Sequence, residues 1–266
     1  MLSELAPSAF HAVFPLDGIT GHPVVNAVIE GHTPGRIFVD DVVAPRAVFI
    51  LTTCGYSYLA GVADNTAFNA ALAALLTESL LPAQARSGDP SLVFYPLTPE
   101  WGAAIPALLP DLSLLALYRR TFTFDAAAFA ARRAALPPLP DGFTLRPIDA
   151  DFLAHSQRQM DPWSSNAAFL GHGCGFCVLD GETPVSECFT VFVGAGVAEI
   201  EIRTEEVYRR RGCATHTAAA LIAACLERGL RPNWECWWEN EPSTGLAQKL
   251  GFEMLEDHPV YLWEAQ

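Results

Sequence analysis

The residues best suited to bind a charged ligand are three consecutive arginines, Arg209, Arg210 and Arg211, followed by the small residues Gly212 and Ala214. They stand just before the N-terminus of an expected helix, where unpaired N–H groups already carry partial positive charge. Three cations at such a place are unfavourable unless an anion is bound there. Gly212 and Ala214 let the backbone approach that anion closely. The pattern favours an anion site; the alternative is a solvated charge cluster.

The surrounding residues do not match the common nucleotide-binding loops. No Gly-x-Gly-x-x-Gly motif opens a helix in this sequence, and no Gly-Lys-Ser/Thr follows an expected strand. A dinucleotide-binding fold or a P-loop would need one of them, because their glycines let the backbone wrap around the phosphates. The anion therefore belongs to a different class of cofactor.

Two carboxylates on the preceding strand could handle a proton. Glu199 and Glu201 lie two residues apart within the alternating segment 197–204, so both side chains are expected on one face of the strand. A carboxylate there could remove the proton of an ammonium group, directly or through water, and attract a cationic amine. The alternative is a solvated face on which Glu201 and Arg203 form an exposed pair. We favour the catalytic interpretation for Glu201 over Glu199.

The seven cysteines are better explained as buried thiols than as a metal or redox site. Cys174 and Cys177 have the spacing of a zinc or disulfide motif, but the sequence offers no second pair of that kind. Residues three apart on a strand also point to opposite faces of the sheet. We therefore expect no metal site, and free thiols in a protein of the reducing cytoplasm.

The residues around the arginines predict alternating strands and helices in the C-terminal half. Segments with period-two alternation or enriched in β-branched and aromatic residues are expected as strands at 143–148, 175–179, 185–192, 197–204, 233–238 and 260–263. Helices are expected at 150–160, 214–228 and 243–250. Gly229 is a common kind of helix stop and ends the second of these helices. The arginines thus lie between a strand and a long helix.

The N-terminal half repeats part of this order. Its strands are expected at 36–40, 46–50, 56–61, 92–95 and 114–124, and its helices at 65–81, 100–109 and 125–135. The proline-rich stretch 136–142 then interrupts the chain, since proline fixes φ and cannot continue a helix. We predict two domains, 1–135 and 143–266, joined by the linker 136–142, in an α/β fold with mixed sheets.

Composition narrows the choice of ligands. The 266 residues are 51% hydrophobic and 17% charged, which supplies apolar material for packed domains and excludes disorder. The 30 acidic residues outnumber 16 Lys and Arg, and the net charge of −14 disfavours nucleic acid and membrane surfaces and favours cationic small molecules. Residues 1–16 lack the basic start of a secretory signal. No apolar run approaches the ~18 residues of a membrane span.

Two motifs together resemble a known family. The pattern Arg209-x-x-Gly212-x-Ala214, after a strand and before a helix, is similar to the pyrophosphate-binding loop Gln/Arg-x-x-Gly-x-Gly/Ala of the GNAT N-acetyltransferases. Asn240-Glu-Pro-Ser243, leading to Leu250-Gly-Phe252, resembles the end of the same fold. The resemblance covers residues 143–263 and is closest to two-domain bacterial GNAT-type acetyltransferases. It implies a GNAT acyl-CoA transferase fold in the C-terminal half, preceded by a degenerate GNAT-like domain.

The resemblance implies a site for acetyl-CoA. The pyrophosphate would be held by the loop 209–215, and the pantetheine arm would lie between 200–204 and 233–238, bonding to the main chain of Thr204. Asn240 and Ser243 would contact the far end of that arm, although both could instead cap the last helix. The residues assigned to the cofactor in this way are Thr204, Arg209, Arg210, Arg211, Gly212, Cys213, Ala214, Thr215, Asn240 and Ser243.

The sequence departs from the family at the position of a frequent general acid. A tyrosine often stands seven residues after the asparagine to protonate the CoA thiolate, and here that residue is Ala247. Tyr208, Cys236 and Tyr261 are possible substitutes. The resemblance favours an enzyme that moves acetyl to a primary amine of a small molecule. The alternatives are a non-catalytic acyl-CoA-binding module and a peptide or protein N-acetyltransferase.

The N-terminal half lacks a comparable anion loop. Its junction 61–65, between a strand and a helix, contains no arginine, and Asp64 would repel a phosphate. We therefore expect that this half binds no CoA and that it shapes the cleft for the substrate.

Overall fold

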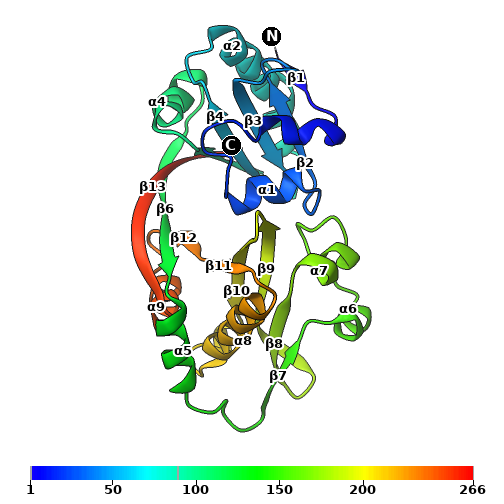
Figure 1. Cartoon of the computed structure of the whole chain (residues 1–266), viewed down its shortest axis with the longest axis vertical. Helices are drawn as coiled ribbons and strands as arrows, with labels where there is room; N and C mark the ends of the chain where they lie inside the picture. The colour runs from blue at the N-terminus through cyan, green and yellow to red at the C-terminus, as the bar shows by residue number, and fades with distance from the viewer. Residues whose placement is uncertain (1, 89, 266) are drawn as a thin grey trace. The chain divides into compact units, whose positions relative to one another are not determined.

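The computed structural model describes residues 2–88 and 90–265. The chain folds into two compact units, whose strands are formed by segments of alternating apolar residues (Figure 1). Unit 1 comprises Met1–Arg119 and His258–Gln266, and unit 2 comprises Arg120–Asp257. The chain passes from one unit to the other within two strands, β6 (Leu115–Phe124) and β13 (Phe252–Glu264). Each unit contains a hydrophobic core of its own.

Unit 1 begins with short elements and continues as a strand-rich segment with covering helices. In chain order the elements are β1 (Ser3–Glu4), η1 (Pro7–Val13), α1 (Pro23–Ile29), β2 (Gly35–Val39), β3 (Ala47–Thr52), β4 (Tyr56–Gly61), α2 (Thr66–Leu75), η2 (Leu76–Leu80), α3 (Leu81–Gln84), β5 (Ser91–Pro96) and α4 (Pro99–Leu108). The predicted strands and long helices of this half are present with small shifts at their ends. The sequence analysis missed β1, η1 and α1.

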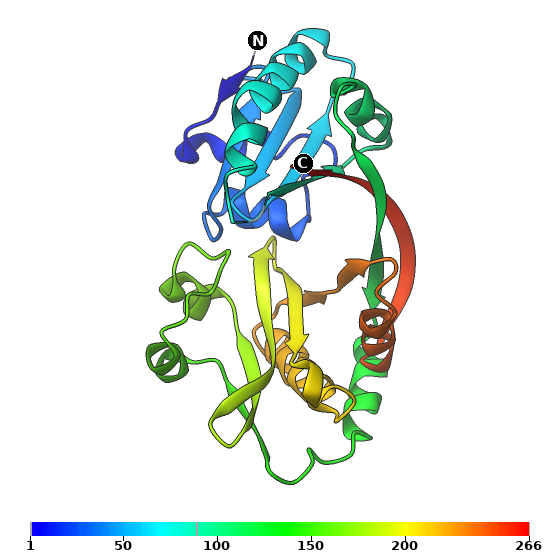
Figure 2. The same ribbon diagram turned by 180° about the vertical axis from the view of Figure 1, so that it is seen from behind.

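The strands of unit 1 lie in the order β1-β2-β3-β4-β5-β13. Neighbours from β1 to β4 are antiparallel, whereas β4 and β5 are parallel. The last residues of the chain add an antiparallel edge, because Tyr261 pairs with Phe94 and Glu264 with Ser91. Figure 2 shows α2 in cyan against the blue strands of this sheet. Phe68 on α2 belongs to the same buried core as residues of β3, β4 and β5.

The sequence analysis expected no segment long and apolar enough to span a membrane, but the helical stretch 66–84 of unit 1, formed by α2, η2 and α3, meets that criterion. Its 19 residues have a mean hydropathy of 1.2, so by length and composition alone it could cross a membrane. The core helix of a soluble domain passes the same test. Here Phe68, Leu72, Leu76 and Leu80 are buried among the apolar residues of unit 1, and 28% of the apolar window is buried within the protein.

Unit 2 contains the loop 209–215 with the three consecutive arginines, here called the arginine loop. After β6 its elements are α5 (Ala126–Ala134), β7 (Phe143–Pro147), α6 (Ala150–Ser156), α7 (Asn166–His172), β8 (Gly175–Asp180), β9 (Thr183–Gly194), β10 (Val197–Thr204), η3 (Glu206–Tyr208), α8 (Cys213–Glu227), β11 (Arg231–Asn233), β12 (Glu235–Trp237), α9 (Glu241–Lys249) and β13. The predicted helix 150–160 ends early, because Gln157 adopts a left-handed conformation with φ of 50°. The helix α7, capped by Ser165, was missed.

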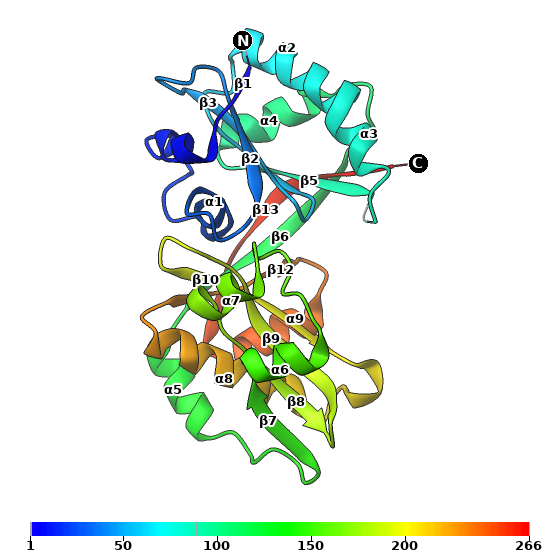
Figure 3. The same cartoon turned by 90° about the vertical axis from the view of Figure 1, so that its right-hand side faces the viewer.

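Five strands of unit 2 form one mixed sheet in the order β11-β10-β9-β8-β7. The pairs from β7 to β10 are antiparallel, and Figure 3 shows β7 and β8 side by side. The pair β10–β11 is parallel. The long helix α8 packs against β8, β9 and β10 (Figure 1), and its apolar residues, among them Leu221 and Ile222, lie in the core. The sheet and α8 therefore fix the two ends of the arginine loop.

The segment predicted as one strand over 233–238 is two short strands. β11 ends at Asn233 and joins the sheet of β10, whereas β12 begins at Glu235 and follows β6 in the other strand order. Trp234 lies between them, buried against Phe252. At Trp234 the chain stops pairing with β10 and continues as β12 beside β6.

The proline stretch 136–142 lies between α5 and β7, both of which belong to unit 2. The prolines do follow the end of a helix, since α5 stops at Ala134. The division between the compact units falls instead within β6 and β13, because these strands carry residues that bond in both units. In unit 2, for example, Arg120 on β6 donates two hydrogen bonds, of 2.8 and 2.9 Å, to Asp257 on β13.

Candidate functional site

The loop between η3 and α8 enters the helix through left-handed backbone conformations. Arg210 and Gly212 both have positive φ, 62° and 86°. Gly212 is the N-cap of α8, and no side chain in the described part of the chain caps this helix. The first amides of a helix have no partner within the helix. The N–H groups of Cys213, Ala214 and Thr215 therefore stand at the positive end of a 15-residue helix.

The three arginines are exposed beside these amides. No ion pair joins Arg209, Arg210 or Arg211 to a carboxylate among the residues that the structure describes. Arg211 instead lies over the ring of Tyr208, 5.3 Å from its centroid. The Tyr208 hydroxyl donates a 3.0 Å hydrogen bond to Asp180, which raises the pKa of this tyrosine. The loop thus concentrates three positive charges that form no ion pair with a carboxylate in the described part of the chain.

The strand before the loop separates from its parallel neighbour. β10 and β11 pair only from Val197 with Arg231 to Glu199 with Asn233. Residues 200–204 of β10 continue to pair with β9 on the other side. Beyond Glu199, therefore, β10 has no partner from β11 in the described chain, and an extended molecule could bond to its main chain there. Thr204 ends the strand, with its hydroxyl 2.8 Å from that of Ser186.

The two candidate carboxylates have different surroundings. Glu199 is only 8% exposed and accepts a hydrogen bond from the side-chain amide of Asn233. Glu201 is exposed. The pairing of β10 with β9 shifts register between Glu199 and Ile200, so a β-bulge separates the two carboxylates. The arrangement gives one fixed, buried carboxylate and one that solvent and a ligand can reach.

A buried carboxylate that the sequence analysis missed lies on the neighbouring strand. Glu187 is 7% exposed and binds both Arg158 and Arg203, the latter with an Nε–Oε2 distance of 2.7 Å. Arg203 therefore pairs with Glu187. The signal in the sequence was a glutamate at an interior position of the apolar segment 185–192. Its two partners could not be read from local spacing.

The candidate residues at the start of α9 are already engaged. Asn240 is the N-cap, and its side-chain oxygen accepts a 3.1 Å hydrogen bond from the amide of Ser243. The Ser243 hydroxyl accepts a 3.0 Å bond from the indole of Trp234. Asn240 therefore has the capping role that the sequence analysis weighed against cofactor contact. Ser243 is bound to a core tryptophan, and its own hydroxyl proton can still be donated.

The possible general acids differ in position. Ala247 is fully buried in the core of unit 2, so the usual tyrosine position faces the interior here. Tyr261 belongs to unit 1, where its hydroxyl donates a 2.6 Å bond to the carbonyl of Gly102. Cys236 is buried, with its sulfur 3.7 Å from the Thr244 hydroxyl. Tyr208 alone of these lies beside the arginine loop.

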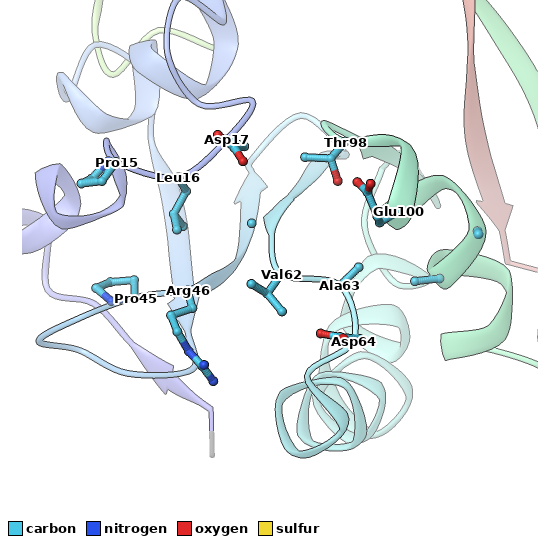
Figure 4. Close-up of a pocket in the computed structure, with 13 residues that line it drawn as sticks. Pro15, Leu16, Asp17, Pro45, Arg46, Val62, Ala63, Asp64, Thr98 and Glu100 are labelled. Atoms are coloured by element: carbon cyan, nitrogen blue, oxygen red, sulfur yellow. The ribbon is translucent and has the colours of Figure 1, made fainter.

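The corresponding place in unit 1 has the opposite charge. β4 and β5 are parallel from Tyr56 to Leu59, and β4 then leads into α2 as β10 leads into α8. A cavity of about 920 Å³ lies at this junction (Figure 4). Its lining includes the carboxylates of Asp17, Asp64 and Glu100, whereas Arg46 is the cation among the residues drawn there.

The family of the chain follows from comparison with known proteins. The family model for GNAT acetyltransferases matches residues 16–261. The uncharacterized N-acetyltransferase YdfB of Bacillus subtilis (strain 168) is 31% identical over 242 residues, which cover 89% of this chain and 88% of YdfB.

Solved structures support the same assignment. A GCN5-related N-acetyltransferase-like protein from Streptococcus suis 89/1591 is 25% identical, with a TM-score of 0.70, and the match covers 97% of this chain and 99% of the other. A tandem GNAT protein from the clavulanic acid biosynthesis pathway shares the fold, with a TM-score of 0.58 at 14% identity over 100% of this chain and 99% of the other. The chain is an acetyltransferase and belongs to the GNAT family.

Proposed function

We propose that this acetyltransferase takes its acetyl group from acetyl-CoA, bound by the loop 209–215, and transfers it to a primary amine of a small molecule. The observation that carries the proposal is the uncapped N-terminus of α8, preceded by Gly212 in a left-handed conformation and by three exposed arginines. When bound, acetyl-CoA supplies an acetyl group activated as a thioester.

The charge of the loop fits a pyrophosphate. Amides at a helix N-terminus favour phosphate oxygens through hydrogen bonds and the helix dipole. Guanidinium groups add charge-assisted bonds to the same oxygens. In this proposal the amides of Cys213, Ala214 and Thr215 and the side chains of Arg209 and Arg210 hold the pyrophosphate. Arg211 is oriented by its contact with Tyr208.

The divergence of β10 and β11 supports a place for the pantetheine arm. The arm contains amide groups, which can pair with the main chain of a strand edge in the manner of an added strand. Residues 200–204 offer such an edge toward β11. Thr204 lies at the end of this edge nearest the arginine loop. Asn240 is already used as a helix cap, so Ser243 is the better candidate for contact with the arm.

The acceptor amine needs a group that removes its proton. Glu201 is exposed and can receive a proton directly or through water. Glu199 is held by Asn233, so its role in this proposal is to add negative charge that attracts an ammonium group. The net charge of −14 favours the same class of acceptor.

The test is release of free thiol from acetyl-CoA in the presence of a panel of small amines and peptides. In the double variant Arg209→Ala and Arg210→Ala we expect the KM for acetyl-CoA to rise by at least about 10- to 100-fold, because even a single hydrogen bond to a charged group contributes about 1.5–3 kcal/mol. The control is Arg133→Ala, which removes an exposed arginine on α5.

An unchanged KM in the double variant would contradict the placement of acetyl-CoA on the loop. Acetylation of peptides without any acetylation of small amines would contradict the class of acceptor. These two failures are distinguishable, because the first concerns the cofactor and the second concerns only the amine.

A further inference from the structure

Two cysteines that are distant in sequence lie together in unit 2. Cys174 occupies the short connection between α7 and β8, and Cys225 lies 51 residues later on α8. Their sulfur atoms are 3.9 Å apart. Cys174 is partly exposed, whereas Cys225 is fully buried. The pair therefore combines a thiol that a small molecule can reach with a second thiol directly behind it.

An arginine holds the connection that carries Cys174. Arg228, the residue that ends α8, donates hydrogen bonds from its two terminal nitrogens to the carbonyls of Gly173 and Gly171, the second at 3.0 Å. These bonds fix the connection against the end of α8 and bring the guanidinium close to the Cys174 sulfur. The hydrogen bond from Cys225 and the charge of Arg228 lower the pKa of Cys174.

A small cavity gives access to this thiol. It has a volume of about 280 Å³, and its lining includes Cys174, Arg228, Ile148 and Phe169. Asp149 and Glu227 also line it. A neutral molecule of the size of hydrogen peroxide can enter such a space, because a single water occupies only about 30 Å³.

The nearby cysteines are less suited to react. Cys177, the apparent partner of Cys174 in the sequence, is buried, and burial together with the charge of Glu187 raises its pKa to about 11. Cys188 is also buried, and burial raises its pKa well above the ordinary value. The thiolate is the reactive form of cysteine. Cys174 is therefore the thiol of this region from which reaction is expected to start.

We propose that Cys174 is a peroxide-reactive thiol and that Cys225 converts its oxidised form into an intramolecular disulfide. The Cys174 thiolate attacks one peroxide oxygen, the O–O bond breaks, and a sulfenic acid and water form. The Cys225 sulfur then attacks the Cys174 sulfur and expels its oxygen as a second water. Two thiols and one peroxide thus become one disulfide and two waters.

The order of the two steps follows from their electrostatics. While Cys174 is a thiolate, its hydrogen bond and negative charge, together with burial, raise the pKa of Cys225. Conversion of Cys174 to a sulfenic acid removes that charge. Cys225 can then lose its proton more easily and attack.

The test treats the protein with limiting hydrogen peroxide, blocks the remaining thiols under denaturing conditions and maps the peptides by mass spectrometry without reduction. We expect two of the seven thiols to be lost, in a peptide that links Cys174 to Cys225. In Cys225→Ala we expect no disulfide and a sulfenic acid on Cys174, which a dimedone probe traps. The matched control is Cys177→Ala, in which the link between Cys174 and Cys225 forms as in the parent protein.

The proposal fails if the link joins Cys174 to Cys177, or if no link forms although other thiols are oxidised. It also fails if Cys174 reacts no faster than Cys54, a partly exposed thiol of unit 1. None of these outcomes depends on acetyl transfer or on the presence of acetyl-CoA.

Discussion

A glycine at each end of α8 allows a matched test of whether the arginine loop binds acetyl-CoA. Gly212 begins the helix with φ of 86°, and Gly229 follows its end with φ of 72°. A Cβ added at Gly212 would meet no atom nearer than His216 at 3.8 Å, and one at Gly229 would meet none within 4 Å. Alanine at either position therefore brings backbone strain without a clash. The cost of the left-handed conformation is about 1–2 kcal/mol per residue.

We expect Gly212→Ala and Gly229→Ala to lower the free energy of unfolding by this similar amount, about 1–2 kcal/mol. Their effects on acetyl-CoA should differ. At 212, relaxation of the alanine out of the left-handed conformation would turn the first amides of α8 away from the ligand. Losing one charge-assisted bond of about 1.5 kcal/mol weakens binding about tenfold. The Gly229→Ala variant should bind acetyl-CoA as the parent protein does.

The measurements are denaturant unfolding for stability and titration calorimetry for affinity. Equal loss of affinity in both variants would mean that general destabilisation, not the loop, is responsible. Parent-like affinity in Gly212→Ala, with stability reduced as in Gly229→Ala, would refute the role of these amides.

Three further outcomes are expected. Calorimetry should give one acetyl-CoA per chain, because the junction near Asp64 repels phosphate; two sites per chain would contradict this. At saturating acetyl-CoA, Glu201→Gln should lower turnover about 10²-fold and leave acetyl-CoA affinity nearly unchanged, and normal turnover in both this variant and Glu199→Gln would exclude a carboxylate base. Ala247→Tyr should lower the free energy of unfolding by about 1–3 kcal/mol, because the alanine is fully buried in a packed core; a stable and faster variant would show that the position opens to the active site.

Local signals in the sequence identified the elements around the arginine loop. The alternating segment 197–204 is the strand β10 with the same limits. The helix predicted at 214–228 is α8, shifted by one residue at each end. Gly212 precedes α8 and Gly229 follows its end, and both were recognised because glycine adopts left-handed conformations that other residue types disfavour.

Features that depend on distant partners could not be predicted in the same way. The aromatic and β-strand character of 233–238 is real, but the change of partner at Trp234 is decided by packing against Phe252. The strand β13 has two neighbours that are distant in sequence: its last residues pair with β5, more than 160 positions earlier in the chain, and β6 lies on its other side.

In the candidate site, too, the residues with local signals were predicted and those with distant partners were not. The arginines and Gly212 were found because their neighbours in sequence are also their neighbours in space. Glu187 was missed because its partners, Arg158 and Arg203, come from other elements. The sequence analysis rejected Cys177 as a partner of Cys174 and named no other, whereas the structure places the sulfur of Cys225, on α8, 3.9 Å from that of Cys174.

The central claim is that acetyl-CoA binds at the N-terminus of α8. Amide hydrogen exchange with and without acetyl-CoA, followed by mass spectrometry, tests it most directly. The amides at 213–215 should exchange more slowly when acetyl-CoA is bound, and those at 61–65 in unit 1 should be unaffected. Unchanged exchange at 213–215 under saturating acetyl-CoA, or slowing confined to 61–65, would contradict the claim.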